Sequence, residues 1–123
     1  FVYTTALPPA TVAADTAAIR RIRRDPDLCA RPLALARRLA GRLDLPAPES
    51  PIVPLVLGGD RPAMEAQQAL ASAGYLVQAI RPPTVPEGTA RLRVTLRAPH
   101  TEADVDGLAA ALAPLLPAGG SGR

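Results

Sequence analysis

The strictest alternation of polar and apolar side chains in the sequence is Arg91-Leu92-Arg93-Val94-Thr95-Leu96-Arg97. Side chains of a β-strand point alternately to its two faces, so this pattern predicts a strand, which we place at residues 89–97. Leu92, Val94 and Leu96 would then face the core, and the arginines and Thr95 would share the opposite face. That face is either simply solvated, or a clamp in which guanidinium groups hold a substrate carboxylate by paired hydrogen bonds.

Two further strands are predicted upstream. Residues 52–57 form a short apolar run, and we place this strand at a sheet edge because Pro54 has no N–H to donate. Residues 75–80 form the second strand. The loop at 81–88 leads to the third strand, and three prolines stiffen this loop around Thr84, its only hydroxyl side chain. The loop is either a structural crossover or a segment that positions a ligand.

Two helices are predicted before the strands. Apolar residues recur at helical spacing over residues 9–24. A second apolar stripe runs to Leu43, and Pro32 within it should kink or split the second helix. We expect Asp25 to cap this second helix at its N-terminus, with a proline at the first helical position.

Two more helices are predicted after the first strand. Asp60 is expected to cap a helix at 61–73, which Gly74 ends in the left-handed conformation. Its inner face is predicted to comprise Ala66, Ala69, Leu70 and Ala73. Thr101 and Asp104 resemble a capping box that opens the last helix. The core face of that helix is predicted to comprise Val105, Leu108, Ala109 and Leu112.

The resulting order of elements is α-α-β-α-β-β-α. It predicts an α+β fold in which a small, largely antiparallel three-stranded sheet is covered by helices. The 123 residues suffice for a single domain with one modest core. We divide them into an entry segment and connecting helix at 1–24, a compact α+β unit at 25–117 and a flexible tail at 118–123. Because the sequence does not begin with Met, we expect it to be a fragment or a processed product.

The basic residues exclude some chemistry. All 14 of them are arginine, so the chain provides no lysine amine for a Schiff base. The run at 20–24 could contact phosphates, but it is also typical of a solvated helix end. We expect no nucleic-acid partner, because the chain has no lysine and only three aromatic side chains to stack on bases.

Other features of the sequence bear on the cellular location, on metal binding and on membrane association. Cys29 is the only cysteine, which excludes an internal disulfide and favours a reducing, cytoplasmic location. His100 has no neighbouring ligand side chains in the sequence, so a metal site is not expected. No apolar run approaches the roughly 20 residues that span a membrane, so we expect no membrane partner.

Several segments carry a family resemblance. Residues 81–93, read Arg-Pro-Pro-Thr-Val-Pro-Glu-Gly-Thr-Ala-Arg-Leu-Arg, together with residues 3–9, 50–54 and 100–101, resemble the C-terminal part of the α-oxoamine synthases. These are pyridoxal-phosphate enzymes of aminotransferase fold type I. The proline-rich loop favours the member that condenses L-alanine with a pimeloyl thioester in biotin biosynthesis, with loss of carbon dioxide. Members that use glycine or serine are the alternative, and a binding module without catalysis is a third interpretation.

The resemblance implies roles for individual residues. Arg93 would bind the carboxylate of the amino acid, and Thr84 would contact substrate at the mouth of the active site. Thr4 and Thr5 would lie near the phosphate of the cofactor, pyridoxal 5'-phosphate, in the neighbouring subunit of a homodimer. The family's cofactor-binding lysine has no counterpart here, so this chain alone would hold no cofactor covalently and would be inactive. The resemblance does not choose between coenzyme A and an acyl carrier protein as carrier of the pimeloyl group.

Overall fold

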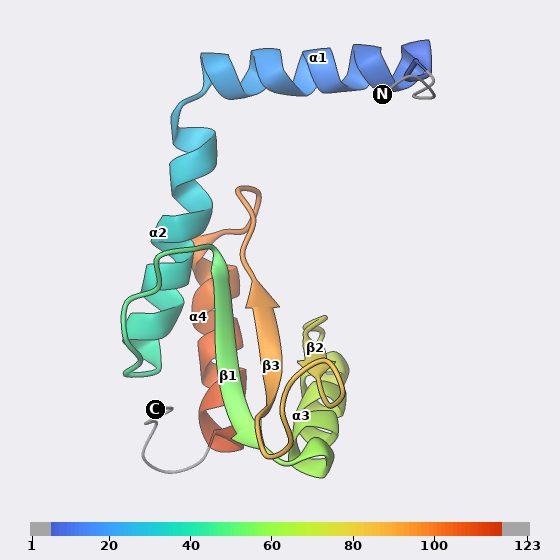
Figure 1. Cartoon of the computed structure of the whole chain (residues 1–123). Coiled ribbons are helices and arrows are strands. Elements are labelled where there is room, and N and C mark those ends of the chain that lie inside the picture. Colours follow the sequence, from blue (N-terminus) through green and yellow to red (C-terminus); the bar gives the residue numbers. More distant parts are fainter. Residues whose placement is uncertain (1–5, 117–123) are drawn as a thin grey trace.

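The computed structural model describes residues 6–116 (Figure 1). Their elements follow the expected order, with one added turn of 3-10 helix at the end. The bounds are α1 (Pro9–Arg24), α2 (Asp27–Arg42), β1 (Ile52–Gly58), α3 (Asp60–Ser72), β2 (Gln78–Ile80), β3 (Ala90–Thr95), α4 (Glu102–Leu112) and η1 (Ala113–Leu115). The predicted α+β fold with a three-stranded sheet is confirmed.

The sheet has the order β1-β3-β2, and both pairings are antiparallel. Strand β1 therefore lies at an edge, as the proline at position 54 predicts. Across the sheet, Arg93 is the partner of Pro54 on one side and of Gln78 on the other. Arg91 is likewise flanked by Val56 and Ile80.

The helices α2, α3 and α4 cover one face of this sheet, and no described element covers the other face (Figure 1). Strand β3 is shorter at both ends than the predicted 89–97. Leu92 and Val94 of β3 are buried on the covered face, and so is Leu96 just beyond the strand, which confirms the alternation predicted for these three side chains. The predicted core face of the last helix is also confirmed. The largest fully buried side chains are Leu39, Leu70, Leu92, Leu112 and Val105.

Helices α2 and α4 are joined by a charged clamp. Arg38 donates to Asp106 through Nε and Nη2, at 2.8 and 2.7 Å. Arg42 donates to the same carboxylate through Nε and Nη2, at 3.1 and 2.8 Å. Arg38 also pairs with Glu102, 2.8 Å between Nη1 and Oε2. Paired hydrogen bonds of this kind fix the orientation of the two helices as well as neutralising their charges.

The second predicted strand is shorter than expected. The prediction of residues 75–80 is wrong at its start, because β2 begins only at Gln78. The backbone N–H of Tyr75 donates to the carbonyl of Leu70 at 2.8 Å and so completes the end of α3. Gly74 has φ +88°, the left-handed conformation predicted for it. The chain is thus still leaving the helix where the pattern suggests a strand, and Leu76 is fully exposed.

Two helix starts differ from prediction. Asp25 does not cap α2: it ends α1, where its N–H donates to the carbonyl of Arg21 at 3.0 Å, and Pro26 precedes the first residue of α2. Asp60 does not cap α3, because it is already the first helical residue and extended Gly59 precedes it. The capping box of Thr101 and Asp104 is confirmed.

Two predictions about helix interiors are also corrected. The predicted split of α2 is wrong, since the helix runs through Pro32 without interruption, and a kink there stays a prediction. On α3, Ala69 and Ala73 are exposed, whereas Ala63 joins Ala66 and Leu70 in the core. The buried stripe of this helix is therefore narrower and begins one turn earlier than predicted.

Helix α1 projects away from the rest of the described chain (Figure 1). It has no buried residue, and its apolar side chains Val12, Ile19 and Ile22 are exposed. The expected division at residue 24 stays a prediction, and the expected tail at 118–123 lies outside the described residues. Among the residues that are described, no helix is long and apolar enough to cross a membrane.

Candidate functional site

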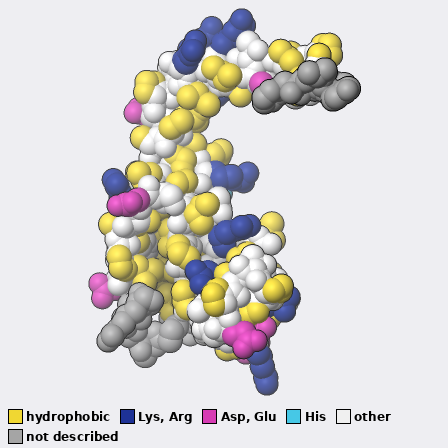
Figure 2. Space-filling model, viewed as in Figure 1, with side chains coloured by type: hydrophobic (Ala, Val, Ile, Leu, Met, Phe, Trp, Pro, Cys, Tyr) yellow, Lys and Arg dark blue, Asp and Glu magenta, His cyan; other side chains and the backbone are white. Residues whose placement is uncertain are grey.

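The open face of the sheet carries the polar side chains of β3. Arg93 and Thr95 are exposed on it and Arg91 is half-buried, as the alternation predicts. Arginine side chains are visible over this part of the molecule in Figure 2. Arg97 is exposed beyond the end of the strand, and its backbone N–H donates to Nδ1 of His100 at 3.2 Å.

The structure distinguishes Arg91 from Arg93, which spacing alone does not. Nε of Arg91 donates to the carbonyl of Thr89 at 3.0 Å, so one edge of this guanidinium is occupied by its own backbone. Nη2 of Arg93 donates to Oε1 of Gln78 at 2.5 Å. Neither arginine forms an ion pair with any residue that the structure describes. Each guanidinium thus has one donor engaged, but Arg93 is exposed and lines a cavity, whereas Arg91 is half-buried and does not line that cavity. Arg93 is therefore the more available of the two for an anionic ligand.

A shallow cavity of about 380 Å³ lies beside Arg93. It is lined by Gln67, Leu76, Val77, Gln78, Arg93 and Thr95. These side chains provide one cation, two amides and a hydroxyl next to an apolar wall. Such a mixture suits a small ligand that combines a carboxylate with an apolar part.

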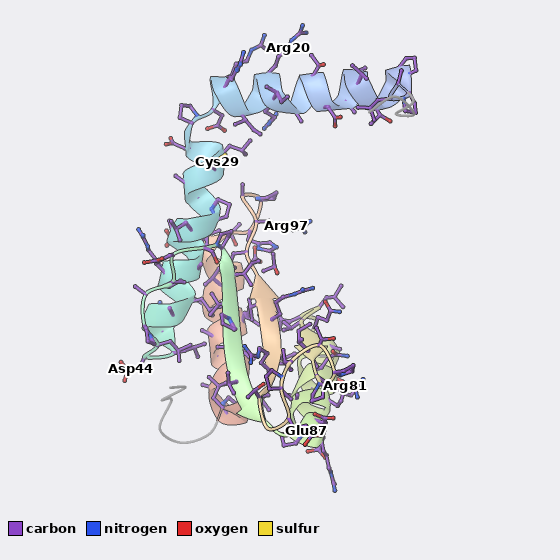
Figure 3. All side chains as sticks on the ribbon, viewed as in Figure 1. Arg20, Cys29, Asp44, Arg81, Glu87 and Arg97 are labelled. Carbon is purple, nitrogen blue, oxygen red and sulfur yellow. The ribbon has the colours of Figure 1, made fainter. Side chains whose placement is uncertain are left out.

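Thr84 lies at another part of the sheet. Its loop joins the end of β2 to the start of β3, so it adjoins the Ile80–Arg91 pair. Figure 3 shows Arg81 and Glu87 of this loop at one end of the sheet and Arg97 towards the other. Thr84 is exposed, and its backbone N–H donates to the carbonyl of Arg81 at 3.0 Å. None of the hydrogen bonds described links it to Arg93.

The remaining site predictions concern the cofactor. Thr4 and Thr5 lie outside the described residues. The sequence has no lysine, so no side chain of this chain can form a Schiff base with an aldehyde cofactor. No group of three or more potential metal ligands occurs among residues 6–116.

Sequence reasoning missed Gln67 and Gln78. Oε1 of Gln67, on α3, accepts from the backbone N–H of Ala79 in β2 at 2.7 Å. Gln78 faces Arg93 across the sheet. Gln78 could have been identified only from its register opposite Arg93, and that register is not predictable across the nine residues that connect β2 to β3. Nothing in the sequence identifies Gln67, because one polar residue on a helix does not indicate which strand it contacts.

The fold is that of a known class of protein. The sequence matches the family described as aminotransferase class I and II over residues 1–112, and the chain belongs to that family. The individual proteins that the chain matches have a more specific activity than the family as a whole. The chain is 56% identical, over 119 residues, to the 8-amino-7-oxononanoate synthase of Methylobacterium nodulans, and 52% identical over 115 residues to that of Maricaulis maris. The family resemblance seen in the sequence is thereby confirmed.

The chain covers only part of these relatives. The two matches include 97% and 94% of this chain but 31% and 29% of the relatives' lengths.

Solved structures agree on the fold. The serine palmitoyltransferase of Sphingomonas wittichii superposes with a TM-score of 0.80 at 28% identity, covering 92% of this chain and 30% of that one. A serine palmitoyltransferase from S. paucimobilis, with a bound PLP–myriocin aldimine, superposes with a TM-score of 0.78 at 31% identity, with the same coverage. Both the fold type and the use of pyridoxal phosphate in this family are supported.

Proposed function

We propose that this chain is the C-terminal domain of a pyridoxal-phosphate-dependent enzyme that condenses L-alanine with a pimeloyl thioester to form 8-amino-7-oxononanoate. The observation that carries the proposal is Arg93, exposed on the open face beside a cavity and without an ion pair in the described chain. Sequence identity of 52–56% to two synthases of that product, against 28–31% to the serine palmitoyltransferases, favours alanine over serine.

In this proposal Arg93 binds the carboxylate of alanine. A planar guanidinium can form two parallel hydrogen bonds with a carboxylate, which fixes the orientation of the amino acid about its α-carbon. Orientation matters because the bonds to be broken, to the α-proton and later to the carboxyl carbon, must be aligned for reaction. Pyridoxal phosphate, when bound, supplies the electron sink for these steps.

Other residues have supporting roles in the proposal. Thr84, in the exposed loop between β2 and β3, contacts substrate where it enters. Thr4 and Thr5 lie near the cofactor phosphate of the other subunit in a cytoplasmic homodimer. The lysine that holds the cofactor belongs to the part of the relatives that this chain does not cover, so the chain alone is inactive.

A chimera tests this proposal. The chain would replace the matching 31% of the Methylobacterium nodulans relative, and the product formed from L-alanine and a pimeloyl thioester would be measured. We expect the chimera to form 8-amino-7-oxononanoate, and to use alanine in preference to glycine and serine. The remainder of the relative without a C-terminal part, and the 123-residue chain alone, should form none. A folded, cofactor-loaded chimera that is inactive with alanine would contradict the proposal, and one that prefers serine would support the alternative.

A further inference from the structure

Gln78 and Arg93 form the only side-chain hydrogen bond between two strands among the described residues. They are direct partners in the antiparallel pairing of β2 and β3, and both point to the open face. The bond runs from Nη2 of Arg93 to Oε1 of Gln78. Because arginine only donates, the oxygen of the Gln78 amide must be the atom that faces it.

This bond leaves the guanidinium able to bind a carboxylate. Nη2 carries two hydrogens, and each belongs to a different edge of the planar group. A single acceptor at Nη2 therefore occupies one edge and leaves the other free, with two parallel donors. Gln78 is neutral, so the positive charge of Arg93 is retained.

The position of Gln78 is itself fixed. Strand β2 is only three residues long, but Gln67 of α3 binds the backbone N–H of Ala79 at 2.7 Å, on the side of β2 away from β3. Ala79, the residue after Gln78, is thus bound to α3 while it lies opposite Leu92 of β3. An exposed arginine would otherwise sample many rotamers, and binding a ligand would have to restrict them.

We propose that Gln78 is a positioning residue: it holds the Arg93 guanidinium in the orientation that receives the amino-acid carboxylate. The inference rests on the proposed function, because it takes that carboxylate as the ligand of Arg93. Gln78 acts through Arg93 and need not touch the substrate. Its removal should weaken the binding of alanine and leave the acyl thioester unaffected.

The test compares Gln78→Met and Gln68→Met in the chimera. Methionine matches the length of glutamine but removes the strong acceptor. Gln68, on the exposed surface of α3, has no side-chain hydrogen bond in the structure and serves as the matched control. Losing one hydrogen bond that orients Arg93 should raise KM for L-alanine about 3- to 10-fold, with KM for the thioester unchanged. Gln68→Met should change neither constant.

Two further variants separate positioning from other roles. Gln78→Glu keeps an acceptor but pairs its charge with Arg93, so it should impair alanine at least as much as Gln78→Met. In an Arg93→Lys background, Gln78→Met should have little additional effect, because the group that it positions is gone.

The outcomes distinguish this inference from the proposed function. If Arg93→Lys impairs the use of alanine but Gln78→Met behaves like Gln68→Met, Gln78 is not a positioning residue and the proposed function stands. If Gln78→Met impairs alanine equally in both backgrounds, Gln78 acts independently of Arg93 and the inference is wrong. If Arg93→Lys leaves the use of alanine unchanged, the carboxylate role of Arg93 and the inference fail together.

Discussion

The arginines on the helix-covered side of the sheet have different partners from Arg93 on the open side. On the covered side, Arg38 and Arg42 share the carboxylate of Asp106, and Arg38 also meets Glu102. On the open side, Arg93 has only a neutral amide as partner in the described chain. An arginine that is fully paired holds two helices together, whereas one that keeps its charge uncompensated is available to an anion. The comparison therefore separates structural arginines from a ligand-binding one.

The largest expected effect is that of Arg93→Lys on the use of alanine. Lysine keeps the charge but loses the two parallel donors. Losing one charge-assisted hydrogen bond should lower kcat/KM for L-alanine in the chimera roughly 10- to 150-fold. KM for the thioester should hardly change. Arg91→Lys is the matched control and should be much milder, because Arg91 is half-buried and does not line the cavity beside Arg93. Steady-state kinetics with each substrate varied in turn provides the measurement, and a larger loss with Arg91→Lys would reverse the assignment.

The next effect is on stability at the α2–α4 clamp. Hydrogen bonds from Arg38 and then Arg42 hold the pKa of the Asp106 carboxyl well below its usual range. A carboxyl whose pKa is lower in the folded state contributes stability above its unfolded pKa, near 4, and loses it as the pH falls towards the folded value. Asp106→Asn should therefore lower the melting temperature of the chain at pH 7, on the order of 5 °C.

The same variant has a distinct pH dependence. Between about pH 5 and pH 2 the melting temperature of Asp106→Asn should fall less steeply than that of the unaltered chain. Asp104 retains a lowered pKa through its bonds from the Thr101 backbone and side chain, so some acid sensitivity persists. Thermal unfolding followed by circular dichroism across this pH range measures both quantities. Parallel curves for the two chains would show that the clamp contributes no pH-dependent stability.

A smaller effect on stability is expected at Gly107 of α4, where a side chain would overlap Tyr75. A Cβ at Gly107, on α4, would lie 2.4 Å from the hydroxyl oxygen of Tyr75. Alanine favours a helix over glycine by about 1 kcal/mol, but the overlap costs about 1–3 kcal/mol. Gly107→Ala should therefore destabilise the chain by about 1 kcal/mol in urea unfolding. In a Tyr75→Phe background the same change should become neutral or stabilising. Destabilisation in both backgrounds would mean that the overlap is not the cause.

The smallest effect is expected on the open face. Thr95 is exposed there, and Thr95→Val replaces its hydroxyl with a methyl group of similar size. Substitutions on an uncovered surface usually change stability by less than about 0.5 kcal/mol. Urea unfolding should place this variant within that range of the unaltered chain. A loss comparable to that of Gly107→Ala would show that the open face is packed against something in the isolated chain.

The contrast between the faces was partly readable from the sequence. A strand pattern with period two assigns Leu92 and Arg93 to opposite faces without further information, and the structure agrees. The capping box at Thr101 was also predictable, because it depends only on residues three positions apart in the sequence. The clamp was not predictable, because Arg38 and Asp106 are 68 residues apart and each is an ordinary polar residue on its helix.

Other differences also have local physical causes. Strand β2 begins later than its apolar pattern predicts, because the backbone N–H of Tyr75 still bonds to the end of α3. Asp25 and Asp60 have the side chains of N-caps, but each lies one residue away from the observed N-cap position of its helix. The apolar stripe of α1 correctly predicts a helix, but it does not predict what packs against that helix.

The central claim is that Arg93 binds substrate and Arg38 stabilises the fold. It is tested most directly by measuring kcat/KM for L-alanine in the chimera, and the melting temperature of the chain, for Arg93→Lys and Arg38→Lys side by side. Arg93→Lys should lose kcat/KM and keep its melting temperature, whereas Arg38→Lys should lower the melting temperature and leave the kinetics of the folded enzyme unchanged. If Arg93→Lys instead unfolds the chain, or if both variants lose kcat/KM to the same extent while remaining folded, the distinction between the two faces is wrong.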